Sequence, residues 1–265
     1  MRPSGNIGTV PGIVDQPEGA LMKRMLRAAV TAAVTVLAAG TLGGCAFLAP
    51  PKQFSDTTSV DEAIATVQIV DNQGSVTVRG VDGATETTVA RRVSYRGERP
   101  EGETFTVQGD TLELRGCGPR CKVDYTIDVP AGVDVRGSTS NGAIELDDVG
   151  DVEVGTSNGR IDLEGVDGTV DVSTSNGRIE GDDLNGDGIR AETSNGAIDL
   201  SLGTAQDVEA VTSNGSIELS VPADSYRVLT ETSNGGTNIG IASDPDGRFT
   251  LDLRTSNGSI TVEEE

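Results

Sequence analysis

The chain has 265 residues, with 20 Lys and Arg against 42 Asp and Glu, no His and no Trp, and its formal net charge at pH 7 is −22. Such a charge repels nucleic acid and anionic headgroups, and it favours cations, basic partners and solubility. The lack of His excludes a Ser–His pair and imidazole metal ligands, so an enzyme of this composition would have to work with carboxylates.

The amino-terminal segment is typical of an export signal. Lys23, Arg24 and Arg27 precede an apolar run over 28–42, which is short for a membrane span but long enough for the hydrophobic part of a signal peptide. We therefore predict a signal peptide over residues 1–44. An ordinary signal peptide and a short membrane helix are the alternatives to the lipoprotein signal described next. Residues 1–21 are expected to be dispensable, because a signal of ordinary length would begin at Met22 or Met25.

The apolar run ends in Leu-Gly-Gly-Cys at 42–45. This sequence resembles the cleavage box of bacterial lipoproteins, and the resemblance implies that Cys45 becomes amino-terminal and carries a lipid such as palmitate. The protein is then exported and anchored to the outer face of the cell membrane, or to an outer membrane. Pro50, Pro51 and the polar residues after them predict that 45–62 is a flexible tether, which holds the folded part a few nanometres off the membrane.

Two further cysteines, Cys117 and Cys121, flank the sequence Gly-Pro-Arg. In an exported protein this spacing predicts a disulfide that closes a short turn. A redox-active pair is the alternative, although nothing nearby supplies an activating base. A zinc site would lack His ligands and is the weakest interpretation.

The tetrapeptide Thr-Ser-Asn-Gly occurs seven times at spacings of 17 to 23 residues. A repeat of this period predicts one structural unit stacked on itself, as in an all-β, β-helix-like solenoid with one repeat per coil. The competing interpretation is an antiparallel meander with seven Asn-Gly hairpins. The repeated Asn residues are Asn141, Asn158, Asn176, Asn195, Asn214, Asn234 and Asn257.

Each repeat predicts a strand, a corner and a second strand. Apolar or small residues alternate before the tetrapeptide, as in Val152, Val154 and Thr156, and Ile usually recurs three positions after the Asn. The Gly is expected to supply a positive φ at the corner. Continued alternation places the Thr and the Asn inside and the Ser outside, so we expect the seven Asn side chains to form a buried ladder of amide hydrogen bonds.

The two ends of the solenoid differ from its middle. Residues 74–83 match 159–168, so the first coil is expected to start near residue 65, with 63–130 as wider, capping coils and 131–265 as the regular solenoid. Tyr95, Phe105 and Tyr125 are expected to seal the first end. The last repeat is expected to be an open edge, at which Glu263, Glu264 and Glu265 oppose end-to-end stacking.

The position after the Ile is acidic in five consecutive repeats and is expected to point outward. Such a column of carboxylates is a candidate face for a cation or a basic partner, and a solvated surface is the plainer interpretation. Asp183, Asn185 and Asp187 have the spacing of a calcium loop, but Ser194 stands where that loop needs a Glu. The five residues are Glu145, Asp162, Glu180, Asp199 and Glu218.

The cleavage box, the Cys117–Cys121 pair, the segment Val-Asp-Tyr-Thr-Ile-Asp-Val-Pro-Ala-Gly-Val at 123–133 and the Ser/Thr-Asn-Gly coils together resemble a bacterial family. Its function is unknown, and it is labelled as a family of candidate adhesins with β-strand repeats. The resemblance covers about 65–262 and implies a single-stranded, right-handed β-solenoid on the cell envelope. It brings no catalytic residues. We expect no cofactor, with Ca²⁺ as the one candidate ion.

The function expected from these features is that of a non-enzymatic, lipid-anchored, monomeric module for binding, adhesion or spacing. Its expected partners are the membrane, through the lipid, and a cell-wall polymer or another envelope protein, but not nucleic acid. The alternatives are a carbohydrate-active enzyme that works along the acidic column, and a calcium-binding surface rod.

Overall fold

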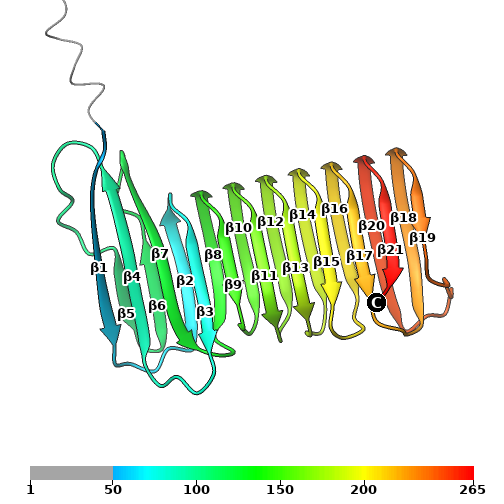
Figure 1. The fold of residues 1–265 in the computed structure, drawn as a ribbon, viewed down its shortest axis with the longest axis horizontal. Helices are drawn as coiled ribbons and strands as arrows, with labels where there is room; N and C mark the ends of the chain where they lie inside the picture. Colours follow the sequence, from blue (N-terminus) through cyan, green and yellow to red (C-terminus); the bar gives the residue numbers. More distant parts are fainter. Residues whose placement is uncertain (1–49) are drawn as a thin grey trace, which may run out of the picture. The chain divides into compact units, whose positions relative to one another are not determined.

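The computed structural model describes residues 50–265, in which every regular element is a β-strand and no helix is long and apolar enough to cross a membrane. The strands form two sheets (Figure 1). Sheet A contains, in spatial order, β1 (Lys52–Val60), β4 (Thr87–Tyr95), β7 (Cys121–Pro130), β3 (Val76–Val81), β9 (Ile144–Asp147), β11 (Ile161–Val166), β13 (Ile179–Leu184), β15 (Ile198–Leu202), β17 (Ile217–Val221), β21 (Ile260–Glu264) and β19 (Thr237–Ile239).

Sheet B contains, from the opposite end, β18 (Tyr226–Asn234), β20 (Phe249–Asn257), β16 (Val208–Asn214), β14 (Ile189–Asn195), β12 (Val170–Asn176), β10 (Val152–Asn158), β8 (Asp134–Asn141), β2 (Thr66–Asn72), β6 (Thr111–Arg115) and β5 (Phe105–Gln108). Each repeat places one strand in sheet B and the next in sheet A, and we call this pair a coil. The Thr-Ser-Asn-Gly segment lies at the turn between the two strands.

Neighbouring coils pair in parallel and in register. Val152 lies opposite Val170, and Ile161 lies opposite Ile179, so identical positions of the repeat stack along the solenoid. The predicted all-β solenoid is confirmed, and the parallel pairing excludes a meander of hairpins. The alternating Val, Ile and Leu side chains of both sheets are buried between them and form one continuous core. Each such side chain stabilises the fold by about 1.5–3 kcal/mol when it is fully buried.

The carboxyl-terminal coil does not lie at the end of the solenoid. The strands β20 and β21 are inserted between the coil β16–β17 and the coil β18–β19, and Figure 1 shows them in red between yellow and orange strands. The expectation of an open edge at the last repeat is therefore wrong. The outermost coil is β18–β19, in which the exposed Thr230 and Thr237 stand opposite the buried Leu253 and Ile260. Threonine thus replaces two of the apolar side chains of this end coil, beside the half-buried Val228 and Ile239, and makes its outer side more polar, as terminal repeats require.

The amino-terminal end is also out of sequence order. The coil β2–β3 pairs in parallel with β8 and β9, as expected for a first coil near residue 65, but the coil β6–β7 lies outside it. Within 84–130, β4 pairs antiparallel with β7 and β5 pairs antiparallel with β6, so this segment is not simply a run of wider coils. Tyr125 is fully buried at this end, with Tyr95 and Phe105 packed against the core.

The predicted tether is shorter than expected. Lys52–Val60 forms β1, which pairs antiparallel with β4 over its whole length and covers the edge of sheet A. The guanidinium of Arg91 in β4 donates to both carboxylate oxygens of Asp56, at 2.6 and 3.0 Å. The polar composition of this segment suggested disorder, but the edge of β4 supplies the hydrogen bonds that its backbone needs.

Candidate functional site

The seven Asn side chains form one continuous chain of amide hydrogen bonds along the turns from sheet B to sheet A. Six Nδ2 groups each donate to the Oδ1 of the Asn in the adjacent coil at 3.0–3.1 Å, in the spatial order Asn234, Asn257, Asn214, Asn195, Asn176, Asn158, Asn141, and the last of these only accepts. These side chains are exposed, so the expectation that they are buried is wrong. The strand pairing skips the Ser between Thr and Asn, and the side-chain alternation ends there, because Ser and Asn are both exposed.

The Thr of the repeat has a role that sequence reasoning missed. In every coil its hydroxyl donates to a glycine carbonyl of the adjacent coil, at 2.9–3.1 Å; Thr174, for example, donates to Gly159. Six of the seven Thr side chains are buried. The identity of the residue in all seven repeats was the available signal, since packing alone would also admit Val.

The repeated Gly is needed for close approach between coils. A Cβ on Gly177 or Gly196 would lie 1.8 Å from the carbonyl oxygen of the Gly in the adjacent coil, far inside contact distance. Among the repeat glycines only Gly142 has a positive φ, of 156°, so the expectation that each corner needs a left-handed residue is wrong. The corners stack so tightly that only hydrogen fits at this position.

The outer surface of sheet A carries the acidic column, with its five members stacked in register between β9 and β17. A second column stands two residues further along three of these strands. We call the eight residues together the acidic face. Six of them line a hollow of about 390 Å³ on this surface. The second column consists of Asp147, Glu164 and Asp182.

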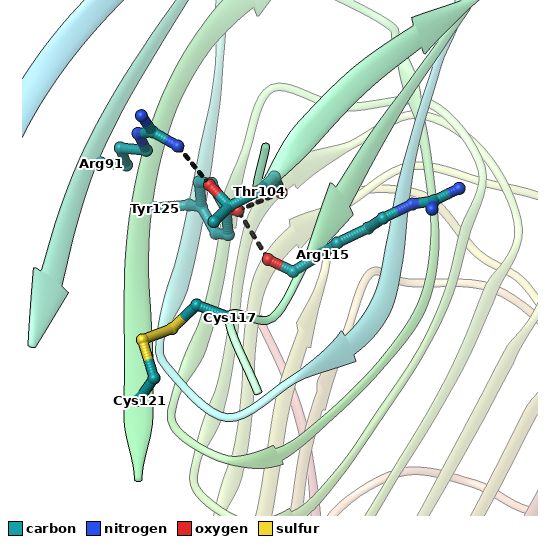
Figure 2. The surroundings of a disulfide bond; sticks show 6 residues. All are labelled: Arg91, Thr104, Arg115, Cys117, Cys121 and Tyr125. Atoms are coloured by element: carbon teal, nitrogen blue, oxygen red, sulfur yellow. Dashed lines mark hydrogen bonds between the residues drawn. A yellow bond between two sulfur atoms is a disulfide. The ribbon is translucent and has the colours of Figure 1, made fainter. Parts of the chain in front are cut away.

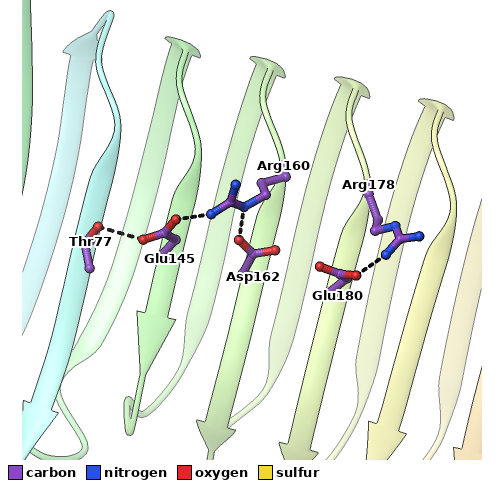
Figure 3. Close-up of polar contacts among 6 residues, drawn as sticks. All are labelled: Thr77, Glu145, Arg160, Asp162, Arg178 and Glu180. Carbon is purple, nitrogen blue, oxygen red and sulfur yellow. Dashed lines mark hydrogen bonds and ion pairs between the residues drawn. The ribbon is translucent and has the colours of Figure 1, made fainter.

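Arginines neutralise one part of the acidic face only. Arg160 pairs with Glu145 and Asp162, and Arg178 pairs with Glu180 (Figure 3). Arg79 lies 3.7 Å from Asp147. Within residues 50–265, the other four carboxylates form no ion pair, and they are Glu164, Asp182, Asp199 and Glu218.

The surroundings of the carboxylates shift their pKa values in two directions. Burial raises the pKa of Asp162 above its ordinary 3.8, against the lowering effect of Arg160, and Glu180 and Glu145 raise it further. Burial likewise raises the pKa of Asp147, although Arg79 lowers it. At the opposite turn, the backbone N–H and the hydroxyl of Thr169 donate to Asp151 and lower its pKa.

These directions predict how stability depends on pH. The raised pKa values of Asp147 and Asp162 mean that their contribution is fully present below pH 3.8 and is lost as the pH rises through their folded-state values. The contribution of Asp151 is present above 3.8 and is lost as the pH falls through its lower folded-state value. In low salt, we expect the melting temperature to rise as the pH falls from 7 to about 4.5, and to decrease in stronger acid.

Calorimetry across this pH range checks the prediction. High salt should flatten the rise, because it screens repulsion between exposed carboxylates. The Asp162→Asn variant should show a smaller rise than the unmodified protein. A melting temperature that decreases steadily from pH 7 would contradict the prediction.

The predicted disulfide between Cys117 and Cys121 is present, with a Cα–Cα distance of 5.5 Å. It closes the turn from β6 to β7 (Figure 2), the position at which the seven repeat coils have Thr-Ser-Asn-Gly. The hydroxyl of Tyr125 lies within hydrogen-bonding reach of the backbone carbonyls of Thr104 and Arg115, and burial raises its pKa to about 12. Together these contacts fasten the outermost parallel coil, which suits a structural rather than a redox-active disulfide.

The remaining predicted sites are placed as follows. Asn185 turns its amide nitrogen toward the carboxylate of Asp183, at 3.0 Å, so this loop holds itself together. Within residues 50–265, no three His, Cys, Asp or Glu side chains are grouped so that they could hold a metal ion. Cys45 and the signal peptide predicted over 1–44 lie outside the described residues.

Comparison with known proteins gives a family and several structures with low sequence identity. The model of the family Toastrack DUF4097 matches residues 59–265. Solved structures that are similar include a candidate cell adhesion protein from Clostridium sporogenes, with 11% identity over 81% of this chain and 100% of that chain and a TM-score of 0.39.

Two further structures are described as candidate adhesins. The one from Bacteroides fragilis shares 14% identity over 81% of this chain and 99% of that chain, with a TM-score of 0.40. The one from Parabacteroides merdae shares 12% identity over 81% and 96%, with a TM-score of 0.41. A comparison with curated proteins gives no match.

Proposed function

Since the chain belongs to the Toastrack DUF4097 family, we propose that it is a non-enzymatic binding module, anchored by a lipid on Cys45 to the outer side of a bacterial membrane. The observation that carries the binding role is the acidic face on the outer surface of sheet A, where four carboxylates have no ion pair within residues 50–265. The regular coils hold these groups in fixed positions, so that a partner meets an ordered surface.

The proposed partner is a basic segment of an envelope protein or a cell-wall polymer with amino groups. Stacked coils bring carboxylates to about 4.8 Å from one another, a spacing at which like charges repel. A cationic partner relieves this repulsion, and the repulsion returns when the partner is removed. On sheet B the acidic column is interrupted, because Arg136 and Arg190 stand in register with its carboxylates. Arg190 and Arg254 pair there with Glu192, Glu209 and Asp252.

Photo-crosslinking in cells tests the binding role. A crosslinking residue at Ser201, which lines the acidic hollow, should capture a defined basic partner, and capture should decrease at high salt. The same residue at Ser173, on the outer surface of sheet B, is the matched control. Capture at Ser201 should be lost when Asp182, Asp199 and Glu218 are neutralised. Equal capture at both positions would refute the role of the acidic face.

Substitution of Cys45 tests the anchor separately. Cys45→Ala should release the protein from membranes or block its maturation, because the site of lipid attachment is removed. Membrane fractionation and the mass of the processed protein are the measurements. Unchanged processing and retention would refute the anchor and leave the binding role to be judged by crosslinking.

A further inference from the structure

The basic side chains of this acidic protein concentrate near the point where the chain enters the folded part. Residues 137–265 contain 6 basic and 26 acidic residues, a net charge of −20, whereas residues 50–136 contain 10 and 14, a net charge of −4. Six exposed cations of the second group share one corner, which we call the basic rim. They are Lys52, Arg92, Arg96, Arg99, Arg120 and Lys122.

Strand pairing brings the basic rim together. Lys52 begins β1 and lies opposite Tyr95 at the end of β4, and Tyr95 lies opposite Cys121 at the start of β7. The backbone N–H of Arg96 donates to the carbonyl of Arg120 at 3.2 Å. The ammonium of Lys52 donates to the carbonyl of Gly97 at 3.0 Å, which ties the loop after β4 to the start of β1.

The remaining members lie on the same corner. Arg99 stacks over the ring of Phe54 with its guanidinium carbon 3.9 Å from the ring centroid. The ammonium of Lys122 lies 2.9 Å from the carboxylate of Asp124, and Asp124 stands opposite Arg92 in the pairing of β4 with β7. Six cations thus lie on one corner of a strongly acidic protein. Glu101 and Glu103 lie further along the loop, in a hollow beside Thr58 and Arg91.

The length of the chain places the basic rim close to the proposed anchor. Because β1 begins at Lys52, seven residue steps separate it from Cys45. A fully extended chain spans at most about 3.6 Å per residue, so the start of β1 lies within about 25 Å of the lipid-modified residue. This is a shorter connection than a tether to residue 62 would give. Because Lys52 itself belongs to the basic rim, the rim lies where the predicted anchor segment joins the folded part.

We propose that the basic rim binds the anionic headgroups of the bilayer in which the protein is anchored, an inference that rests on the lipid anchor of the proposed function. Guanidinium and ammonium groups donate to phosphate oxygens with the strength of charge-assisted hydrogen bonds. The strongly acidic coils beyond residue 137 are repelled by the same surface. The two effects together orient the solenoid with its amino-terminal corner toward the membrane and its acidic face accessible to a partner.

Limited proteolysis of the mature lipoprotein tests this inference. The protein is reconstituted in vesicles of phosphatidylcholine alone, or with phosphatidylglycerol as one lipid in three, and cleavage by trypsin after Arg96 and Arg120 is followed by mass spectrometry. We expect cleavage to be about tenfold slower on the anionic vesicles, as two or more basic groups at an anionic surface imply. High salt should abolish the difference. Cleavage after Arg248, which lies at the other end of the solenoid, should not change.

Two variants and one added polymer separate the alternatives. Lys52→Gln with Lys122→Gln should weaken the protection, whereas Arg178→Gln with Arg254→Gln, on the coils, should leave it unchanged. Equal cleavage on both kinds of vesicle would overturn the inference while the anchor stands. Dissociation of the protein from vesicles in high salt would instead show that the lipid anchor is missing. The inference about the basic rim would then lose its premise. Equal protection on neutral vesicles by soluble polyglycerol phosphate would overturn the assignment to lipid.

Discussion

Replacing Gly196 by Ala is expected to lower the free energy of unfolding by about 3 kcal/mol, because an inserted methyl group that cannot be accommodated forces the backbone to move. The new Cβ would lie 1.8 Å from the carbonyl oxygen of Gly177 in the adjacent coil. Moving the two coils apart would weaken the strand pairing of both sheets and the Asn ladder at this turn. For a domain of about 200 residues, the melting temperature should decrease by roughly 6–12 °C.

Gly236→Ala is the matched control. Gly236 follows the repeat glycine of the outermost coil, and a Cβ at this position would meet no atom within 4 Å. Its substitution should therefore change the free energy of unfolding by less than about 0.5 kcal/mol. Denaturant unfolding of both variants is the measurement. Equal stability of the two variants would show that the repeat Gly is not required for close stacking.

Replacing Leu253 by Ala is expected to lower the free energy of unfolding by about 3 kcal/mol, within the range for creating a cavity in a packed core. Leu253 belongs to the carboxyl-terminal coil, but it is fully buried because β20 lies between β16 and β18. Leu229→Ala, on the adjacent strand β18, is the matched control, because Leu229 is 39% exposed. Its loss should change stability by less than about 0.5 kcal/mol.

Amide hydrogen exchange distinguishes the two possible orders of the last coils. An interior β20 should retain its amide protons longer than β18, since β18 is at the edge of sheet B and can open locally. If the coils were stacked in sequence order, β20 would be the edge strand and would exchange first. That result, together with a small effect of Leu253→Ala, would contradict the observed topology.

The regular coils were predictable because several independent features of the sequence indicate the same structure. The alternation of Val and Leu, the recurring Ile and the seven identical tetrapeptides each indicate stacked parallel strands, and the outward column from Glu145 to Glu218 follows from the same alternation. The Asn ladder was predictable for the same reason. Its exposure was not, because the alternation on which the expectation of burial rested is interrupted at the Ser that the strand pairing skips.

What the sequence by itself determined is the repeating unit: its period, its parallel stacking, its acidic outer column and its Asn, whose amides bond from one coil to the next. Only the tertiary structure decided the order of the coils at both ends. Coils with the same repeat can pair in the same register with several neighbours, since Asn214, Asn257 and Asn234 occupy equivalent positions, so local pattern does not select among them. The order of the coils depends on which arrangement buries Leu253 and exposes Thr230. That arrangement is set by contacts between segments that are distant in the chain.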